Sequence, residues 1–260
     1  MNQAQINEAA DYLHQARKQA EEVERLTAKF GEFTLAEAYA IQSRGIDLRV
    51  EDGERILAYK MGLTSEGKRK QMGLDSPIYG VLTDLMRVDS HEPFKLDSSI
   101  HPKIEPEIAF FIDQQIEGCA SLEEVMRAIS MVCPTLEVLD SRYVGFKYFS
   151  LPDVVADNAS SFKYILGEAV EFNRALDYSN LKINFKINGE TAHEAMSSEI
   201  SGNPMKSIVE MAKLFHEQGR RMPTKAWVLA GAATPAVSLS PQMKVELNIE
   251  GLGYLKVDIA

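Results

Sequence analysis

Two glutamates lie one residue apart at the start of the apolar segment from Ile104 to Ile112. If this segment is an extended strand, Glu105 and Glu107 project from the same face, because side chains alternate between the two faces of a strand. Two parallel carboxylates repel each other unless a positive charge lies between them, and a hard divalent cation would supply that charge. The pair therefore predicts a metal site. A solvated strand face is the simpler alternative.

A third acidic residue, Glu137, interrupts the segment from Val132 to Asp140, whose composition is typical of a strand. A lone glutamate among leucine and valine is costly to bury unless it is neutralised, paired or coordinated. Glu137 is therefore a candidate third ligand, and an ion pair with a lysine or arginine is the alternative.

Three further positions carry groups that suit an active site. Lys60 lies between an apolar segment and a glycine turn, where partial burial would make it an acid/base or anion-binding group; a surface lysine at a strand end is the alternative. The polar segment 157–161 follows an apolar one and could equally be a helix cap or turn. The small residues of 229–235 leave backbone amides accessible to an anion, or form a tightly packed strand exit.

Charge and motif content exclude several classes of function. The chain has 260 residues and a net charge of −10 without a long basic stripe, which argues against a general nucleic-acid binder. Its five histidines lack the spacing of a zinc site, and no nucleotide-binding loop or serine-hydrolase elbow occurs. No segment has the ~18 apolar residues of a membrane span and no signal peptide is evident, so we expect a cytoplasmic protein that does not bind membranes.

The hydrophobic pattern predicts an α+β protein. Helices are expected up to about Val50, one of them opening at the capping box Thr34 to Glu37, and β structure is expected after Gly53. The other predicted elements are a helix from Ser121 through Ile129, a strand over 182–187 with a turn at 188–189, a helix from Pro204 to Gly219, and a hairpin over 243–259.

Five segments taken together resemble the fumarylacetoacetate hydrolase superfamily, and the likeness runs from about Phe33 to the C-terminus. They are Lys60 to Thr64, Ile104 to Phe110, Leu136 to Val138, Val155 to Ser160, and Gly231 with Ala232. The likeness is greatest to the branch of decarboxylases and hydratases that act in catechol meta-cleavage. It implies a mixed β-roll core with flanking helices, divided into a mainly helical region 1–75 that includes the lysine strand and a β-rich catalytic domain 76–260.

The resemblance also implies roles for individual residues. Glu105, Glu107 and Glu137 would bind Mg²⁺ or Mn²⁺, and Lys60 would be the active-site lysine. The substrate pocket would be lined by Ile78, Tyr79, Asp157, Ser160, Gly231 and Ala232.

One position favours a decarboxylase over a hydratase. Hydratases of this branch carry an acidic residue in a turn that reads Asp75-Ser76-Pro77-Ile78-Tyr79-Gly80 in this chain, and Ile78 cannot orient or deprotonate water. We therefore expect decarboxylation of the dicarboxylate 2-oxo-3-hexenedioate to 2-hydroxypenta-2,4-dienoate and CO2, with the cation as electron sink. The alternatives are the hydratase itself and a non-catalytic partner subunit of that hydratase. The resemblance further implies an oligomer in complex with the pathway hydratase.

Overall fold

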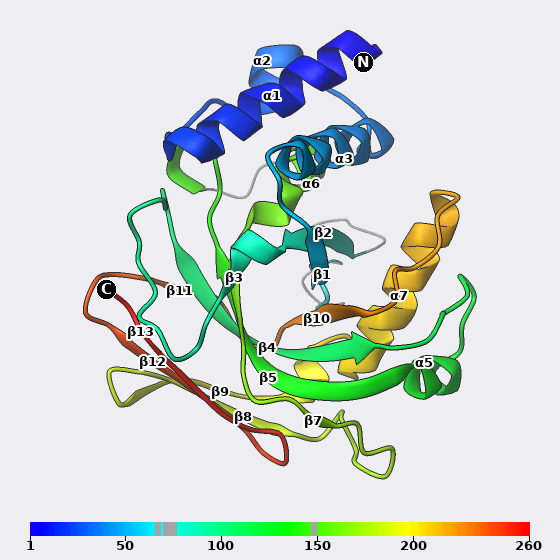
Figure 1. Ribbon diagram of the computed structural model, residues 1–260, viewed down its shortest axis with the longest axis vertical. Coiled ribbons are helices and arrows are strands. Elements are labelled where there is room, and N and C mark those ends of the chain that lie inside the picture. The colour runs from blue at the N-terminus through cyan, green and yellow to red at the C-terminus, as the bar shows by residue number, and fades with distance from the viewer. Residues whose placement is uncertain (66–68, 70–76, 147–149) are drawn as a thin grey trace.

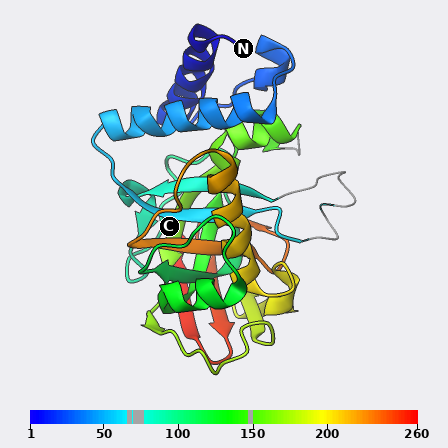
Figure 2. The ribbon, with the colours of Figure 1, turned by 90° about the vertical axis from the view of Figure 1, so that its right-hand side faces the viewer.

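Four helices form a cap at one end of the molecule, above the sheets (Figures 1 and 2). The computed structural model describes residues 1–65, 69, 77–146 and 150–260. The cap consists of α1 (Gln3–Gln19), α2 (Leu26–Phe30), α3 (Leu35–Glu51) and α6 (Leu151–Ala156). Capping boxes at Asn2 and Thr34 fix where α1 and α3 begin. Helix α3 packs against both α1 and α6, so the cap is held together by its own apolar core.

Below the cap, nine strands of the described residues form one mixed sheet whose main path runs β2-β1-β10-β4-β5-β6-β3. Their bounds are β1 (Ile56–Gly62), β2 (Ile78–Thr83), β3 (Arg87–Val88), β4 (Lys103–Ile112), β5 (Ile129–Leu139), β6 (Ser161–Leu166), β7 (Val170–Glu171), β10 (Ala226–Ala232) and β11 (Val237–Ser238). The pairs β1–β10 and β3–β6 are parallel, and the other pairs are antiparallel.

A second, four-stranded antiparallel sheet has the order β13-β12-β8-β9 and contacts β5 through β12 and β13. Its strands are β8 (Lys182–Ile187), β9 (Glu190–Met196), β12 (Lys244–Ile249) and β13 (Gly253–Asp258). Helices α5 (Leu122–Ala128) and α7 (Pro204–Glu217) flank the large sheet (Figure 1). The short 3-10 helices are η1 (Asp84–Met86), η2 (Val144–Phe146), η3 (Asn158–Ser160) and η4 (Ser197–Glu199).

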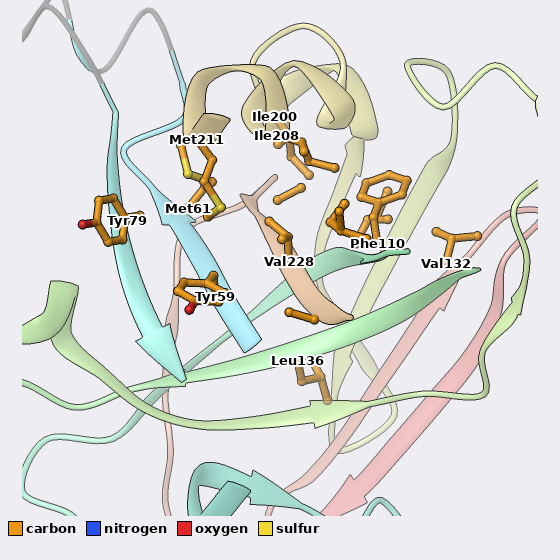
Figure 3. Packing of buried hydrophobic residues seen from close by; sticks show 14 of the residues in the cluster. Tyr59, Met61, Tyr79, Phe110, Val132, Leu136, Ile200, Ile208, Met211 and Val228 are labelled. Carbon is orange, nitrogen blue, oxygen red and sulfur yellow. The ribbon is translucent and has the colours of Figure 1, made fainter. Parts of the chain in front are cut away.

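The main hydrophobic core lies on one face of the large sheet, between that sheet, α7 and the second sheet. Tyr59 and Met61 of β1 and Tyr79 of β2 point into this core, as Figure 3 shows. Because side chains alternate along a strand, the residues next to these in β1 and β2 face the other way. Lys60 and Ile78 therefore lie on the opposite face, toward the helical cap.

The predicted α+β content is confirmed, as are both predicted hairpins. The helix expected to run through Ile129 ends at Ala128, because Ile129 already pairs with Ile112 as the first residue of β5. Strand β1 joins the large sheet, so the first 75 residues contribute to it. The boundary at 75/76 lies outside the described residues, and that division stays a prediction. In the part of the chain that the structure describes, no helix is long and apolar enough to cross a membrane.

Candidate metal centre and active site

The three glutamates meet on two neighbouring strands. Glu105 and Glu107 share one face of β4, and Glu137 of β5 stands directly opposite Glu105 in the antiparallel register. One carboxylate oxygen from each residue lies within 4.8 Å of the others. The even-numbered neighbours Ile104, Ile108 and Leu136 point into the main core, which fixes the direction of the carboxylates. The predicted convergence of the three side chains is thus observed.

Burial makes this cluster unfavourable without a cation. Glu107 and Glu137 are 0% exposed, so the alternative of a solvated strand face does not hold. Burial, followed by repulsion from Glu137 and Glu105, raises the pKa of Glu107 well above its ordinary value. Among the described residues, Oε1 of Glu107 and both carboxylate oxygens of Glu137 accept no hydrogen bond of good geometry, although Oε1 of Glu137 lies at ion-pair distance from Lys60. A set of unsatisfied carboxylate oxygens is the kind of donor set that Mg²⁺ or Mn²⁺ prefers.

Lys60 lies beside the cluster rather than on the surface. Its side chain is buried, and Nζ lies 3.1 Å from Oε1 of Glu137, an ion-pair distance. Gly80 stands opposite Lys60 in the register of β1 and β2, and a Cβ atom there would lie 3.1 Å from Cε of the lysine. The glycine therefore leaves room for the lysine chain, and the ammonium partly neutralises the carboxylates.

A cavity of about 270 Å³ opens next to these groups. Of the predicted site residues, it is lined by Lys60, Ile78, Glu105, Ser160 and Ala232. The other lining residues that carry polar or aromatic groups are Thr64, Ser65, Lys103, Phe146 and Thr234. The structure therefore brings together a carboxylate cluster, two lysines and an apolar wall.

Tyr79 does not line this cavity. It follows Ile78 directly in β2, and consecutive side chains of a strand point to opposite faces. Its ring stacks on Tyr39 in the core, its hydroxyl donates to Oε1 of Gln218, and it accepts a hydrogen bond from Arg220. Only one of the two residues can reach a ligand in the cavity, and the structure places Ile78 there.

Asp157 lies behind the cavity wall and binds Arg142. Its carboxylate accepts hydrogen bonds from Nε and the backbone N–H of Arg142 and from Oγ of Ser141. The guanidinium also donates to the backbone carbonyls of Asp140, Asp157 and Ser161. These contacts hold a turn in which Asn158, Ala159 and Ser160 have φ angles of 51°, 52° and 55°, a conformation that costs energy in residues with a side chain. Asp157 thus shapes the turn that presents Ser160.

Gly231 contributes its backbone rather than the cavity wall. Its N–H donates a 2.8 Å hydrogen bond to Oε2 of Glu107, at an irregularity in the pairing of β10 with β4. The sequence predicted that this amide serves a carboxylate or oxyanion of the substrate, and in the structure it binds the side chain of Glu107 instead. Such a bond orients the glutamate toward its two partners.

Two residues of the cavity, Lys103 and Phe146, were missed, and only Lys103 could have been predicted from the sequence pattern. Lys103 has the same parity as Glu105 and Glu107, so the alternation that paired the glutamates also places this lysine on their face of β4. Phe146 belongs to a 3-10 helix and carries no periodic signal.

Replacing Gly231 by alanine is expected to lower both stability and metal affinity. The residue has φ of +104°, and a Cβ atom would lie 2.5 Å from Oγ1 of Thr64. Left-handed backbone costs an alanine about 1–2 kcal/mol, and overpacking adds about 1–3 kcal/mol. Urea unfolding and Mg²⁺ calorimetry measure the two effects.

Gly189→Ala is the matched control, because Gly189 has φ of +83° with no atom near the added Cβ. It should lose only the backbone contribution and leave metal binding unchanged. Equal behaviour of the two variants would contradict the role given to Gly231.

Known proteins are similar to this chain in sequence and in structure. Residues 68–260 match the family model described as fumarylacetoacetate (FAA) hydrolase C-terminal. A 4-oxalocrotonate decarboxylase of Pseudomonas putida is 36% identical over 97% of this chain and 96% of its own length. A 2-keto-4-pentenoate hydratase of Paraburkholderia xenovorans (strain LB400) is 31% identical over 99% of this chain and 96% of its own.

A solved structure is also similar over its whole length. The 4-oxalocrotonate decarboxylase from Pseudomonas putida G7, complexed with magnesium and adipate, superposes with a TM-score of 0.95 and is 33% identical, covering 100% of this chain and 99% of its own. The curled mixed sheet with flanking helices is therefore the fold expected from the sequence. With the family model matched over most of its length and relatives aligned from end to end, this chain belongs to the fumarylacetoacetate hydrolase family.

Proposed function

We propose that the protein catalyses the Mg²⁺- or Mn²⁺-dependent decarboxylation of 2-oxo-3-hexenedioate to 2-hydroxypenta-2,4-dienoate and CO2. The observation that carries the proposal is the cavity lined by Glu105, Lys60 and Ile78, with the carboxylates of Glu107 and Glu137 buried next to that of Glu105. The similar enzyme solved with magnesium and adipate, a six-carbon dicarboxylate, supports both the metal and the substrate class.

Each group of the site has a task in this reaction. Glu105, Glu107 and Glu137 would hold a divalent ion, which would act as a Lewis acid on the 2-oxo acid. As the bond to the distal carboxylate breaks, its electrons pass through the conjugated chain to the oxygen on C2. Lys60 donates a hydrogen bond to that oxygen as its charge develops and then a proton, which yields the dienol.

The wall of the cavity favours CO2 loss over hydration. Adding water to a diene requires a group that orients or deprotonates the water, and Ile78 has none. Leu63, Val154 and Ala159 continue the apolar wall toward the helical cap. Asp75 and Ser76 of the same turn lie outside the described residues.

The hydratase is the second candidate, because a 2-keto-4-pentenoate hydratase is similar over nearly the whole chain. It would use the same metal and the same lysine, but it would add water to the diene instead of releasing CO2. A non-catalytic partner subunit is the third candidate. The buried carboxylates argue against it, because burying them costs free energy of folding that a subunit without a reaction has no reason to spend. The complex with the pathway hydratase, the oligomer and the cytoplasmic location stay predictions.

The purified chain, incubated with Mg²⁺ and 2-oxo-3-hexenedioate, is expected to release one CO2 for each dienol formed. A chelator should stop the reaction and excess Mg²⁺ should restore it, because the three glutamates cannot replace the ion. Trapping of CO2 measures the CO2 released, and chromatography of the products measures the dienol formed. Formation of 4-hydroxy-2-oxopentanoate from 2-hydroxypenta-2,4-dienoate would establish the hydratase instead. No turnover and no Mg²⁺ binding by calorimetry would establish the non-catalytic subunit.

A further inference from the structure

Lys103 is a second lysine of the cavity that the mechanism above does not use. It begins β4, two residues before Glu105 and on the same face, and it lines the cavity with Glu105 and Lys60. The two lysines differ in their partners. Nζ of Lys60 lies 3.1 Å from Glu137, whereas Lys103 has no carboxylate within ion-pair distance among the residues that the structure describes.

An aromatic ring holds the Lys103 ammonium at the cavity. Its Nζ lies over the ring of Phe146, 4.2 Å from the ring centroid, and Phe146 lines the same cavity. A cation–π contact attracts an ammonium without neutralising its charge. The lysine is thereby positioned as a cation for which the described part of the chain offers no carboxylate at ion-pair distance.

The charges of the site show what anion is missing. A divalent ion together with Lys60 would balance the three carboxylates of the cluster. A 2-oxo dicarboxylate adds two negative charges, one at the metal end and one at its far end. Among the residues that the structure describes, Lys103 is the remaining lining cation, since no other described lysine or arginine lines the cavity.

The spacing along β4 also fits a six-carbon substrate. Two residues of a strand span about 6.6 Å, and a chain of six carbons spans roughly 6 Å, given carbon–carbon bonds near 1.5 Å. A ligand that starts at Glu105 and runs along the strand therefore ends near Lys103.

We infer that Lys103, held by Phe146, binds the distal carboxylate and selects dicarboxylates over monocarboxylic 2-oxo acids. This inference rests on the proposed function. It also gives a reason for product release. The dienol formed after CO2 loss keeps only its C1 carboxylate and has no distal carboxylate for Lys103 to bind. Lys103 is thus a specificity-determining residue, while Lys60 acts at the opposite end of the substrate.

Calorimetry with a matched pair of unreactive ligands tests the inference on the Mg²⁺-loaded full chain. The pair is 2-oxoadipate and 2-oxohexanoate, which differ only in the distal carboxylate. We expect the wild type to bind 2-oxoadipate about tenfold more tightly or better, the usual worth of a charge-assisted hydrogen bond. Lys103→Met should bind both ligands equally, within about twofold, and its unchanged binding of 2-oxohexanoate would show that it is folded.

Two control variants separate this contact from general electrostatics. Lys103→Arg should retain a preference for 2-oxoadipate, and Lys182→Met, which removes an exposed lysine of the second sheet, should retain all of it. A full preference in Lys103→Met, or no preference in the wild type, would overturn the inference. Decarboxylation by the wild type is measured separately, so that loss of the proposed function and loss of dicarboxylate selection give different results.

Discussion

Glu107→Gln is expected to weaken Mg²⁺ binding by at least about 100-fold and to abolish turnover at ordinary metal concentrations. Partners that only orient a ligand contribute about 10–100-fold to metal affinity, and a charged ligand contributes more. The amide keeps the shape of the side chain and can still accept the hydrogen bond from Gly231, so the lost charge is the main change. Calorimetry with Mg²⁺ and the CO2 assay measure the two losses.

The same substitution should raise the stability of the metal-free protein. Burial and the neighbouring Glu137 and Glu105 penalise the ionised form of Glu107, which is why its pKa is raised. A neutral amide removes that penalty. Thermal unfolding is therefore expected to show a higher Tm without metal and little further rise when Mg²⁺ is added, whereas the wild type should gain stability with Mg²⁺.

Glu54→Gln provides the control, because Glu54 is also a buried glutamate but pairs with Arg49 and Thr83 away from the cavity. Breaking that pair should lower the Tm and leave Mg²⁺ affinity as it was. If Glu107→Gln behaved like Glu54→Gln, losing stability while retaining the metal, the three glutamates would not be a metal site.

The carboxylate cluster could be predicted from the sequence because strand periodicity is a local property. The spacing of Glu105 and Glu107 places them on one face of any strand, and the cost of burying Glu137 indicated a partner. The register that sets Glu137 opposite Glu105 could not be predicted, since it depends on how β4 and β5 pair over ten residues. The resemblance to a known family supplied what periodicity could not.

Side chains that act across the fold were harder to predict. Ile78 and Tyr79 were both expected at the substrate, but the alternation of β2 allows only one of them to face it. The packing of Tyr79 against the rings of Tyr39 and Phe215 decides which. Asp157 was expected to face the substrate, and the structure instead shows it bound by Arg142. A buried arginine that pairs 15 residues along the chain leaves no signal in a local pattern.

Lys60→Met is expected to reduce kcat by about 10²–10⁴-fold at saturating metal and substrate, the usual contribution of a positioned proton donor. The ammonium is the group that lies beside the carboxylate cluster and can give a proton to the oxygen on C2. Methionine has a similar volume and suits the space that Gly80 leaves, so packing should survive. We therefore expect kcat to fall while the variant stays folded.

Metal binding is expected to change in the opposite direction. The ammonium lies 3.1 Å from Glu137 and repels a cation held by that glutamate, so its removal should leave Mg²⁺ affinity equal or higher. Without metal, the buried carboxylates of Glu107 and Glu137 and the half-buried one of Glu105 then lack their cation. The Tm of the metal-free variant should therefore fall, and added Mg²⁺ should restore more of it than in the wild type. Lys60→Arg keeps the charge and is the control for this effect. If Lys60→Met lost both turnover and Mg²⁺ affinity, Lys60 would organise the metal site instead of transferring a proton. The direction of the change in Mg²⁺ affinity therefore separates the two roles.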